Sequence, residues 1–176
     1  EIYFNKTKKI IVKNRNVYQP FHLFKSLELL SYKKDHFQTA LDIGAHVGLW
    51  SYYLQFIFTK VYAFEPIKKH INCFKKNIES EKVKLFEHAL GSKKHKLFYN
   101  YNSNSSGASY LSSEINKKKY SCNVKRLDDY KIKNVDFIKI DVEGHEYDVV
   151  IGAKKTIIQN KPLIIIEQKK LQHMVY

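Results

Sequence analysis

The sequence predicts an α/β fold, a Rossmann-like and mostly parallel sheet with helices on both faces. Three observations support it. Apolar segments at 40–43 and 61–64 have the length of buried strands. Segments with helical spacing separate successive strands, and strands joined through a helix pair in parallel. A turn with two glycines follows the first of these strands, as in folds that bind a nucleotide at that point.

The N-terminal residues are expected to form a flank that precedes the core. Residues 2–12 alternate in hydrophobicity and predict an edge strand. Residues 21–30 predict a helix, because apolar side chains recur at helical spacing at Phe21, Phe24, Leu27 and Leu30. We therefore divide the chain into a flank at 1–36 and a core at 37–176, within one domain of 176 residues.

Strands and helices alternate along the core. Strands are predicted at 40–43, 61–64, 83–89, 135–142 and 163–167, and helices between them at 49–58, 68–79 and 147–159. Two further strands, at 96–101 and 120–127, flank a segment rich in Ser, Asn and Gly at 102–114. This region predicts an inserted β-hairpin with a mobile loop.

Two carboxylates at the ends of the first two core strands outline a predicted pocket. Gly44 and Gly48 allow a tight turn and a close ligand, and the following helix directs its N-terminus at the pocket. Glu65 comes 17 residues after Gly48, which suits an acid that binds a ribose diol. Asp42 would repel a phosphate but favour an ammonium or sulfonium, the charges of S-adenosylmethionine. The alternative is an ordinary strand-to-helix turn capped by Asp42.

A second group of ionisable residues follows the fourth core strand. Period-two alternation places Lys139, Asp141 and Glu143 on one side of this strand, at the edge where parallel sheets bind ligands. The spacing of the five possible ligands in this region matches no zinc or calcium pattern, so we expect no metal. Alternatively the acids cap the next helix, an interpretation that fits Glu146 and Asp148 best.

Six segments carry a family resemblance in their order and spacing. They are DIGAHVG at 42–48, FEP at 64–66, HALG at 88–91, SGAS at 106–109, VKRLD at 124–128 and KIDVEGHE at 139–146. Together they resemble the FkbM-type S-adenosylmethionine-dependent methyltransferases over residues 38–168. The sequence departs from that family twice. His46 stands where Asn is more frequent, and the eight residues after Gln168 are too few for antiparallel sixth and seventh strands, which we expect to be missing.

The resemblance implies a class I methyltransferase fold and methylation of a hydroxyl oxygen on a sugar, a glycan or a small natural product. For the cofactor S-adenosylmethionine, it implies that Asp42 holds the methionine amine and Glu65 the ribose. The backbone at His88 and Ala89 would flank the adenine. The turn residues complete the predicted cofactor-binding set, which also contains Gly44, Ala45, His46 and Gly48.

For catalysis we expect an in-line attack of the substrate hydroxyl on the sulfonium methyl group. A carboxylate or an imidazole would accept the hydroxyl proton, and the candidates are Asp141, Glu143 and His145. The segment at 102–114 is a candidate lid that excludes water. Methylation of an RNA 2′-hydroxyl and a domain without turnover are the alternative functions.

The basic composition does not by itself favour a nucleic-acid partner. The formal net charge is +14 and the pI about 9.6. However, only Arg15 and Arg126 of the 31 basic residues are arginine, and the lysines are scattered. A solvated surface is the simpler interpretation. Apolar runs such as LIII at 163–166 are too short to cross a bilayer, so we expect a cytoplasmic protein, for which a homodimer is possible.

The remaining cysteines and histidines are expected to have no chemical role. Cys73 and Cys122 lack the spacing of a metal site or a disulfide scaffold, which predicts free thiols packed as small apolar side chains. Five of the eight histidines lie outside every motif and are expected at the surface: His22, His36, His70, His95 and His173.

Overall fold

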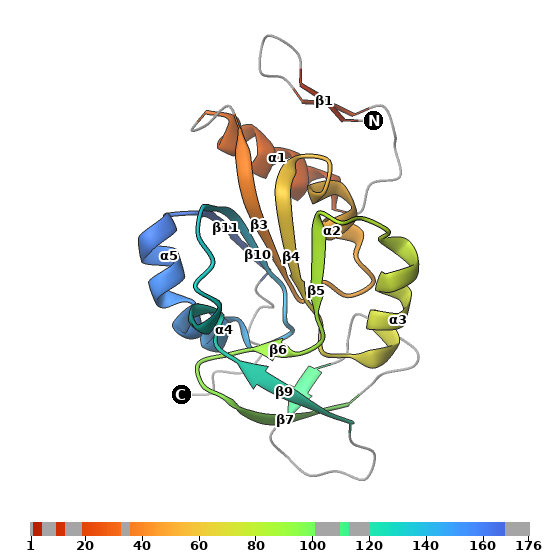
Figure 1. Cartoon of the computed structure of the whole chain (residues 1–176), viewed down its shortest axis with the longest axis vertical. Coiled ribbons are helices and arrows are strands. Elements are labelled where there is room, and N and C mark those ends of the chain that lie inside the picture. The colour runs from red at the N-terminus through yellow and green to blue at the C-terminus, as the bar shows by residue number, and fades with distance from the viewer. Residues whose placement is uncertain are drawn as a thin grey trace, which may run out of the picture.

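A five-stranded parallel sheet forms the centre of the fold (Figure 1). Its order is β11-β10-β3-β4-β5, and all four strand pairs are parallel. The computed structural model describes residues 2–4, 10–12, 19–32, 36–100, 110–112 and 120–167. The predicted α/β fold is confirmed. The strands of this sheet are β3 (Phe37–Ile43), β4 (Phe58–Phe64), β5 (Val83–Phe86), β10 (Val135–Ile140) and β11 (Leu163–Ile166).

Helices cover both faces of the sheet, as predicted. The α-helices α1, α2 and α3 pack on one face, whereas α4, α5 and the short 3-10 helix η2 pack on the other. Their bounds are α1 (Pro20–Ser31), α2 (Leu49–Leu54), α3 (Lys68–Asn77), η2 (Leu127–Tyr130), α4 (Glu146–Gly152) and α5 (Lys154–Asn160). None of these described helices is long and apolar enough to cross a membrane.

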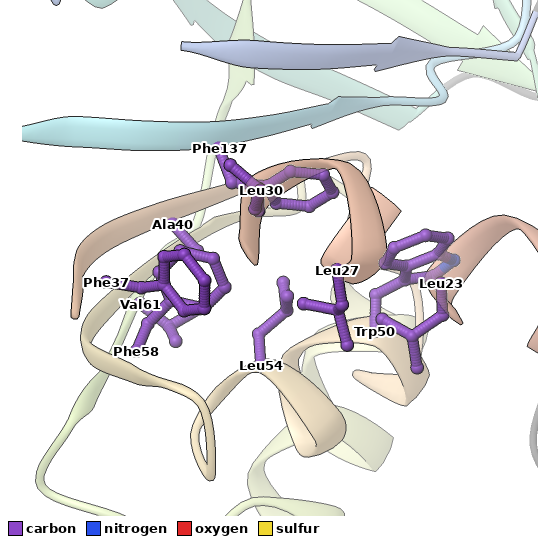
Figure 2. Close-up of a cluster of buried hydrophobic side chains, with 10 residues drawn as sticks. All are labelled: Leu23, Leu27, Leu30, Phe37, Ala40, Trp50, Leu54, Phe58, Val61 and Phe137. Carbon is purple, nitrogen blue, oxygen red and sulfur yellow. The ribbon is translucent and has the colours of Figure 1, made fainter. Parts of the chain in front are cut away.

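Aliphatic and aromatic side chains fill the layer between α1, α2 and the sheet (Figure 2). The rings of Trp50 in α2 and Phe137 in β10 stack with their centroids 6.0 Å apart. Of the four apolar positions predicted for α1, Leu27 and Leu30 are buried in this layer and Phe24 packs against it in part. The fourth position, Phe21, is 73% exposed. The buried members of the cluster are Leu23, Leu27, Leu30, Phe37, Ala40, Trp50, Leu54, Phe58, Val61 and Phe137.

The central strands are buried on both faces. Every residue of β10 is buried, and in β3 Gln38 is the one exposed residue. On the face opposite α1, Val149 and Ala153 join the cluster that contains Ile43 of β3. Such burial is typical of parallel sheets, whose strands read as nearly continuous apolar runs.

Residues 2–12 are not one edge strand, so this prediction was wrong. They contain β1 (Ile2–Phe4) and β2 (Ile10–Val12), which pair antiparallel with each other in a separate two-stranded sheet. An alternating pattern reports that a segment is extended, but it does not say which segment is its partner.

Two predicted helices have different bounds in the structure. The predicted helix at 49–58 ends at Leu54 as α2, and Phe58 instead begins β4 and is buried. The predicted helix at 147–159 divides at Ala153 into α4 and α5. A Cβ at Gly152 would lie 2.0 Å from the carbonyl oxygen of Gly91, so the end of α4 packs directly on the backbone at Gly91. Periodicity within one helix does not report such a contact.

A second sheet lies beyond the carboxyl ends of β4 and β5 (Figure 1). Its order is β6-β9-β7-β8, and β7 and β9 are antiparallel, which confirms the inserted hairpin. The predicted strand at 83–89 divides because β5 ends at Phe86 and Ala89 pairs with Val124 in this second sheet. The strands are β6 (Ala89–Leu90), β7 (His95–Asn100), β8 (Tyr110–Ser112) and β9 (Tyr120–Lys125).

Some sequence predictions fall outside the described residues. Within the predicted loop at 102–114, the structure describes β8 alone, so the lid stays a prediction and the segment at 106–109 is not placed. Residues 168–176 also lie outside the described part. Among the described residues, β11 pairs with β10 alone.

Candidate functional site

The chain reverses its direction across the sheet between β5 and β10. From β3 it adds β4 and β5 on one side, and it then returns to add β10 and β11 on the other side of β3. At such a switch point the connections diverge and leave a crevice at the carboxyl ends of two adjacent strands. Asp42 lies beside Lys139 in the register of β3 and β10. The two groups of predicted site residues therefore meet at this switch point.

The turn after β3 requires glycine. Gly44 (φ 76°) and Gly48 (φ 93°) have a left-handed backbone, and so has His46 (φ 51°). A Cβ at Gly44 would lie 1.8 Å from the carbonyl oxygen of Asp141, so no larger residue fits there without movement of the backbone. The N–H of Gly44 donates a 3.0 Å hydrogen bond to the carbonyl oxygen of Phe64. The turn is thus held between the ends of β4 and β10.

The carboxylate of Asp42 is fully buried and accepts hydrogen bonds from the first turn of α2. Its Oδ2 accepts hydrogen bonds from the N–H of Ser51 at 3.0 Å and from the Ser51 hydroxyl at 2.7 Å. Ser51 lies in the first turn of α2, where N–H groups lack partners within the helix and negative charge is favourable. The N-cap of α2 is Gly48 and not Asp42, but the Asp42 carboxylate accepts hydrogen bonds from this first turn. A contact between Asp42 and a cofactor amine stays a prediction.

The ammonium of Lys139 lies at the centre of the site. Its Nζ donates a 2.7 Å hydrogen bond to the carbonyl oxygen of Gly44, and it lies 3.4 Å from Asp42 Oδ1 and 3.5 Å from Asp141 Oδ2. The sequence placed Lys139 on the same side as Asp141 but gave it no role. The available signal was a lysine inside an apolar strand, because a buried lysine is rare unless it is paired.

Asp141 keeps its side chain 23% exposed at the end of β10. Its N–H donates a 3.0 Å hydrogen bond to the carbonyl oxygen of Ile43, which extends the pairing of β10 with β3. Burial raises the pKa of Asp141 from 3.8 to about 6; the ammonium of Lys139 opposes this rise, and the charges of Glu167 and Glu143 add to it. Asp141 therefore titrates much closer to neutrality than an ordinary aspartate.

Glu143 and His145 lie in the loop between β10 and α4, with side chains that are partly exposed. Glu143 has a left-handed backbone (φ 55°), and His145 is the residue that precedes α4. Glu146 Oε1 accepts a 3.0 Å hydrogen bond from the N–H two residues earlier, and Asp148 Oδ1 accepts one of 2.6 Å from the hydroxyl of Ser92. Both acids lie in the first turn of α4, as the alternative interpretation expected, but neither side chain caps that helix.

Glu65 ties the turn after β3 to the start of α3. Its Oε2 accepts a 2.8 Å hydrogen bond from the N–H of His46, and its Oε1 accepts one of 2.8 Å from the N–H of Ile67. The Nδ1 atom of His70 lies 3.3 Å from the same Oε1. A carboxylate offers about four acceptor positions, so capacity for a further donor remains.

The prediction that His70 lies at the surface was wrong. His70 is 4% exposed, because α3 presents it to the sheet on the same helical face as Phe74, four residues later. Its ring meets the ring of His46 edge to face, with centroids 4.1 Å apart. Burial and the neighbouring His70 lower the pKa of His46, although Glu65 opposes this effect. Helical spacing relative to Phe74 was the signal that could have found His70.

Aromatic rings surround His88 at the ends of β4 and β5. The Nδ1–H of His88 donates a 3.0 Å hydrogen bond to the carbonyl oxygen of Ala89, and the hydroxyl of Tyr130 donates to Nε2. Phe64 and Phe86 stack with centroids 4.9 Å apart, and both contact the ring of Tyr130. Burial lowers the pKa of His88, which fits a neutral ring with one donor and one acceptor nitrogen. Sequence reasoning did not identify Tyr130.

The remaining side-chain predictions have simple outcomes. Cys122 is buried in β9, where burial raises the pKa of its thiol to about 11, whereas Cys73 is exposed on α3. His22 and His36 are exposed. Among the described residues, no group of three or more His, Cys, Asp and Glu side chains is arranged to hold a metal ion.

A solved structure shares this fold. A crystal structure of methyltransferase FkbM from Methylobacillus flagellatus superposes with a TM-score of 0.54 at 19% identity, over 74% of this chain and 33% of that one. A candidate S-adenosylmethionine dependent methyltransferase from Listeria monocytogenes matches 36% of this chain and 32% of its own, with a TM-score of 0.29 and 19% identity. This chain thus spans about one third of the length of either structure.

Sequence comparison identifies the family. No curated protein matches the chain. Residues 42–174, which make up most of the chain and include every described site residue, match the methyltransferase FkbM domain. The chain belongs to the FkbM methyltransferase family.

Proposed function

We propose that this chain is an S-adenosylmethionine-dependent methyltransferase that methylates a hydroxyl of a sugar, a glycan or a small natural product. FkbM-type methyltransferases depend on this cofactor, which is the one predicted from the sequence. The observation that carries the proposal is the convergence of Asp42, Glu65 and Asp141 around the Gly44 turn at the switch point. Three carboxylates and one buried ammonium gather there, in a chain with a net charge of +14.

The residues at this edge suit the chemistry of such a cofactor. Its methionine part is cationic, and carboxylates attract a cation. Its ribose diol donates hydrogen bonds, and Glu65 has remaining acceptor capacity beside the two backbone N–H groups that it already binds. His88 and Ala89, next to the aromatic rings of Phe64 and Phe86, would flank the adenine. When bound, the cofactor supplies an electrophilic methyl group.

The role of Asp42 follows from its burial. Because both Ser51 donors occupy Oδ2 and the side chain has no exposed surface, we assign Asp42 to the support of the turn and of α2. Asp141 keeps an exposed part and is the carboxylate that we assign to the cationic part of the cofactor or to the reacting hydroxyl.

The transfer needs a group that accepts the hydroxyl proton. A general base works best when its pKa lies near the working pH. The pKa of Asp141, about 6, suits it to this role, and Glu143 and His145 remain candidates in the adjoining loop. Asp141 is mostly ionised at neutral pH and can still hold a proton.

Calorimetry and a substrate panel test this proposal. We expect the chain to bind S-adenosylmethionine and to transfer a labelled methyl group to a member of a panel of glycans, lipids, small hydroxyl compounds and RNA. Asp141→Asn should lower kcat by about 10²-fold or more. The matched control is Asp129→Asn, which removes an exposed acid paired with Arg126 outside the site. If the chain does not bind the cofactor, the proposal fails and the alternative of a domain without turnover is favoured.

The alternative acceptor is an RNA 2′-hydroxyl, and the net charge of +14 is the observation in its favour. Binding through phosphates weakens steeply with salt. RNA in the panel, measured at low and at physiological salt, separates this alternative from methylation of a sugar or a natural product.

A further inference from the structure

A lysine at the centre of the site has no role in the mechanism described above. The side chain of Lys139 is 6% exposed and therefore has little contact with solvent. A lysine ammonium is strongly hydrated, so its burial is unfavourable unless other groups replace the water. The identity of those groups indicates what this lysine does.

Three oxygen atoms from two adjacent strands surround the ammonium. One is the carbonyl oxygen of Gly44 after β3, which accepts a hydrogen bond of 2.7 Å. The others are Oδ1 of Asp42 in β3 at 3.4 Å and Oδ2 of Asp141 after β10 at 3.5 Å. Asp42 Oδ1 has no hydrogen bond to any described residue, so its charge is balanced by Lys139. One ammonium thus joins both sides of the switch point.

We propose that Lys139 is a positioning residue for the cofactor: its ammonium holds the Gly44 turn against the end of β10 and lies between the carboxylates of Asp42 and Asp141. This inference rests on the proposed function of the site. Lysine suits the position because its three N–H donors can serve three acceptors. A neutral side chain would leave the buried carboxylate of Asp42 without a counter charge.

The effect on Asp141 follows from the charges around it. They are Lys139 on β10, Glu143 in the following loop and Glu167 after β11. Lys139 is the cation among these three and lowers the pKa of Asp141, while the two acids and burial raise it to about 6. Without the ammonium, the pKa of Asp141 would rise further and a larger fraction of the carboxyl group would be protonated at neutral pH. A protonated carboxyl group does not attract a cationic cofactor.

The main test removes Lys139 together with the buried carboxylate that it balances. The double variant Lys139→Met with Asp42→Asn removes both members of the buried pair, and Asp42→Asn alone isolates the effect of the lysine. Lys139→Gln is a second variant, which retains a donor for the Gly44 carbonyl oxygen but lacks the charge. Lys82→Met is the matched control, because Lys82 is exposed and its Nζ donates a 3.5 Å hydrogen bond to the backbone carbonyl oxygen of Gln55, outside the site.

Two measurements follow the proposal in each variant. Carbon-13 NMR of the Asp141 carboxyl group, without cofactor, gives the pH at which it titrates. Calorimetry with S-adenosylmethionine gives the affinity as a function of pH. We expect the loss of Lys139 to move the titration of Asp141 up by about one pH unit or more, and to weaken binding near neutral pH by about tenfold. Affinity should recover in part at higher pH.

The outcomes separate the two proposals. Unchanged titration of Asp141, or a cofactor affinity that stays within about twofold of Asp42→Asn at every pH, would overturn the role of Lys139. If the wild-type protein fails to bind S-adenosylmethionine, the proposed function fails and the role in cofactor positioning fails with it. The NMR titration then still reports whether Lys139 sets the charge of Asp141.

Discussion

At the scale of single residues, Asp141 combines a chemical role with a cost in stability. Its pKa is raised from 3.8 to about 6, so between these values the folded protein binds more protons than the unfolded chain. The free energy of unfolding therefore falls as the pH rises through this window. The shift corresponds to about 2 to 3 kcal/mol at neutral pH. A site acid with this property destabilises the protein that carries it.

The first prediction concerns Asp141→Asn. We expect this variant to be more stable than the wild type near neutral pH by about 2 kcal/mol, and the difference to vanish near pH 4, where Asp141 is protonated. Urea unfolding at a series of pH values measures both. An equal stability of the two proteins at neutral pH would contradict the raised pKa.

The second prediction uses two glycines with a left-handed backbone. Gly44→Ala places a Cβ 1.8 Å from the carbonyl oxygen of Asp141, so the backbone must move, and we expect a loss of about 3 kcal/mol or more. Gly144→Ala is the matched control, because its φ is 100° but its Cβ meets no atom within 4 Å. It should cost only about 1 to 2 kcal/mol of backbone strain.

Denaturant unfolding and calorimetry with S-adenosylmethionine distinguish the two glycine variants. We expect Gly44→Ala to lose cofactor binding and Gly144→Ala to retain it. Similar losses of stability in both variants would show that the left-handed backbone, and not the contact of Gly44 with β10, sets the requirement for glycine.

At the scale of secondary structure, α2 depends on a residue that lies outside it. The helix has six residues, which is too short for stability in isolation. Asp42 in β3 accepts hydrogen bonds from both the N–H and the hydroxyl of Ser51, and Trp50 and Leu54 bury the helix against α1 and the sheet. The position of the helix is therefore coupled to the first site carboxylate.

The third prediction tests this coupling. Ser51→Ala removes the 2.7 Å hydrogen bond from the hydroxyl to Asp42 and leaves the backbone N–H in place. We expect a loss of about 1.5 to 3 kcal/mol, since hydrogen bonds to charged groups contribute this much. Ser80→Ala is the control, because its hydroxyl accepts a 3.3 Å hydrogen bond from a backbone N–H instead. If thermal unfolding shows equal losses for both variants, the hydrogen bond from Ser51 to Asp42 contributes little to stability.

At the scale of the whole molecule, the site is acidic while the chain is basic. The net charge of +14 contrasts with three carboxylates and one ammonium at the switch point. A basic protein surface attracts anions over long distances, and salt screens this attraction. A cationic cofactor in an acidic site is screened less, because the charges that it meets are partly buried.

The fourth prediction follows from this contrast. Between about 50 and about 200 mM salt, we expect the affinity for S-adenosylmethionine to change by less than about threefold, whereas any binding of RNA should fall by orders of magnitude. Calorimetry for the cofactor and filter binding for RNA give the two dependences. RNA binding that persists at the higher salt would favour the RNA alternative.

The order of strands and helices was predictable because it is a local property. The apolar segments at 40–43 and 61–64 lie within β3 and β4, and the segment at 163–167 contains β11. The helices between these strands impose parallel pairing. Element ends were less predictable. Phe58 continues the apolar pattern of α2, yet its burial against α1 places it in β4.

By itself, the sequence determined the fold class, the glycine turn and the acids at the strand ends, because a backbone conformation and a strand end are set by neighbours along the chain. The tertiary structure alone decided that Lys139 binds the carbonyl oxygen of a residue 95 positions away, and that His70 is buried beside Glu65. It also decided that the Asp42 carboxylate accepts its hydrogen bonds from Ser51 in α2. Partners far apart in sequence meet only after the sheet forms, and burial then makes their charges matter.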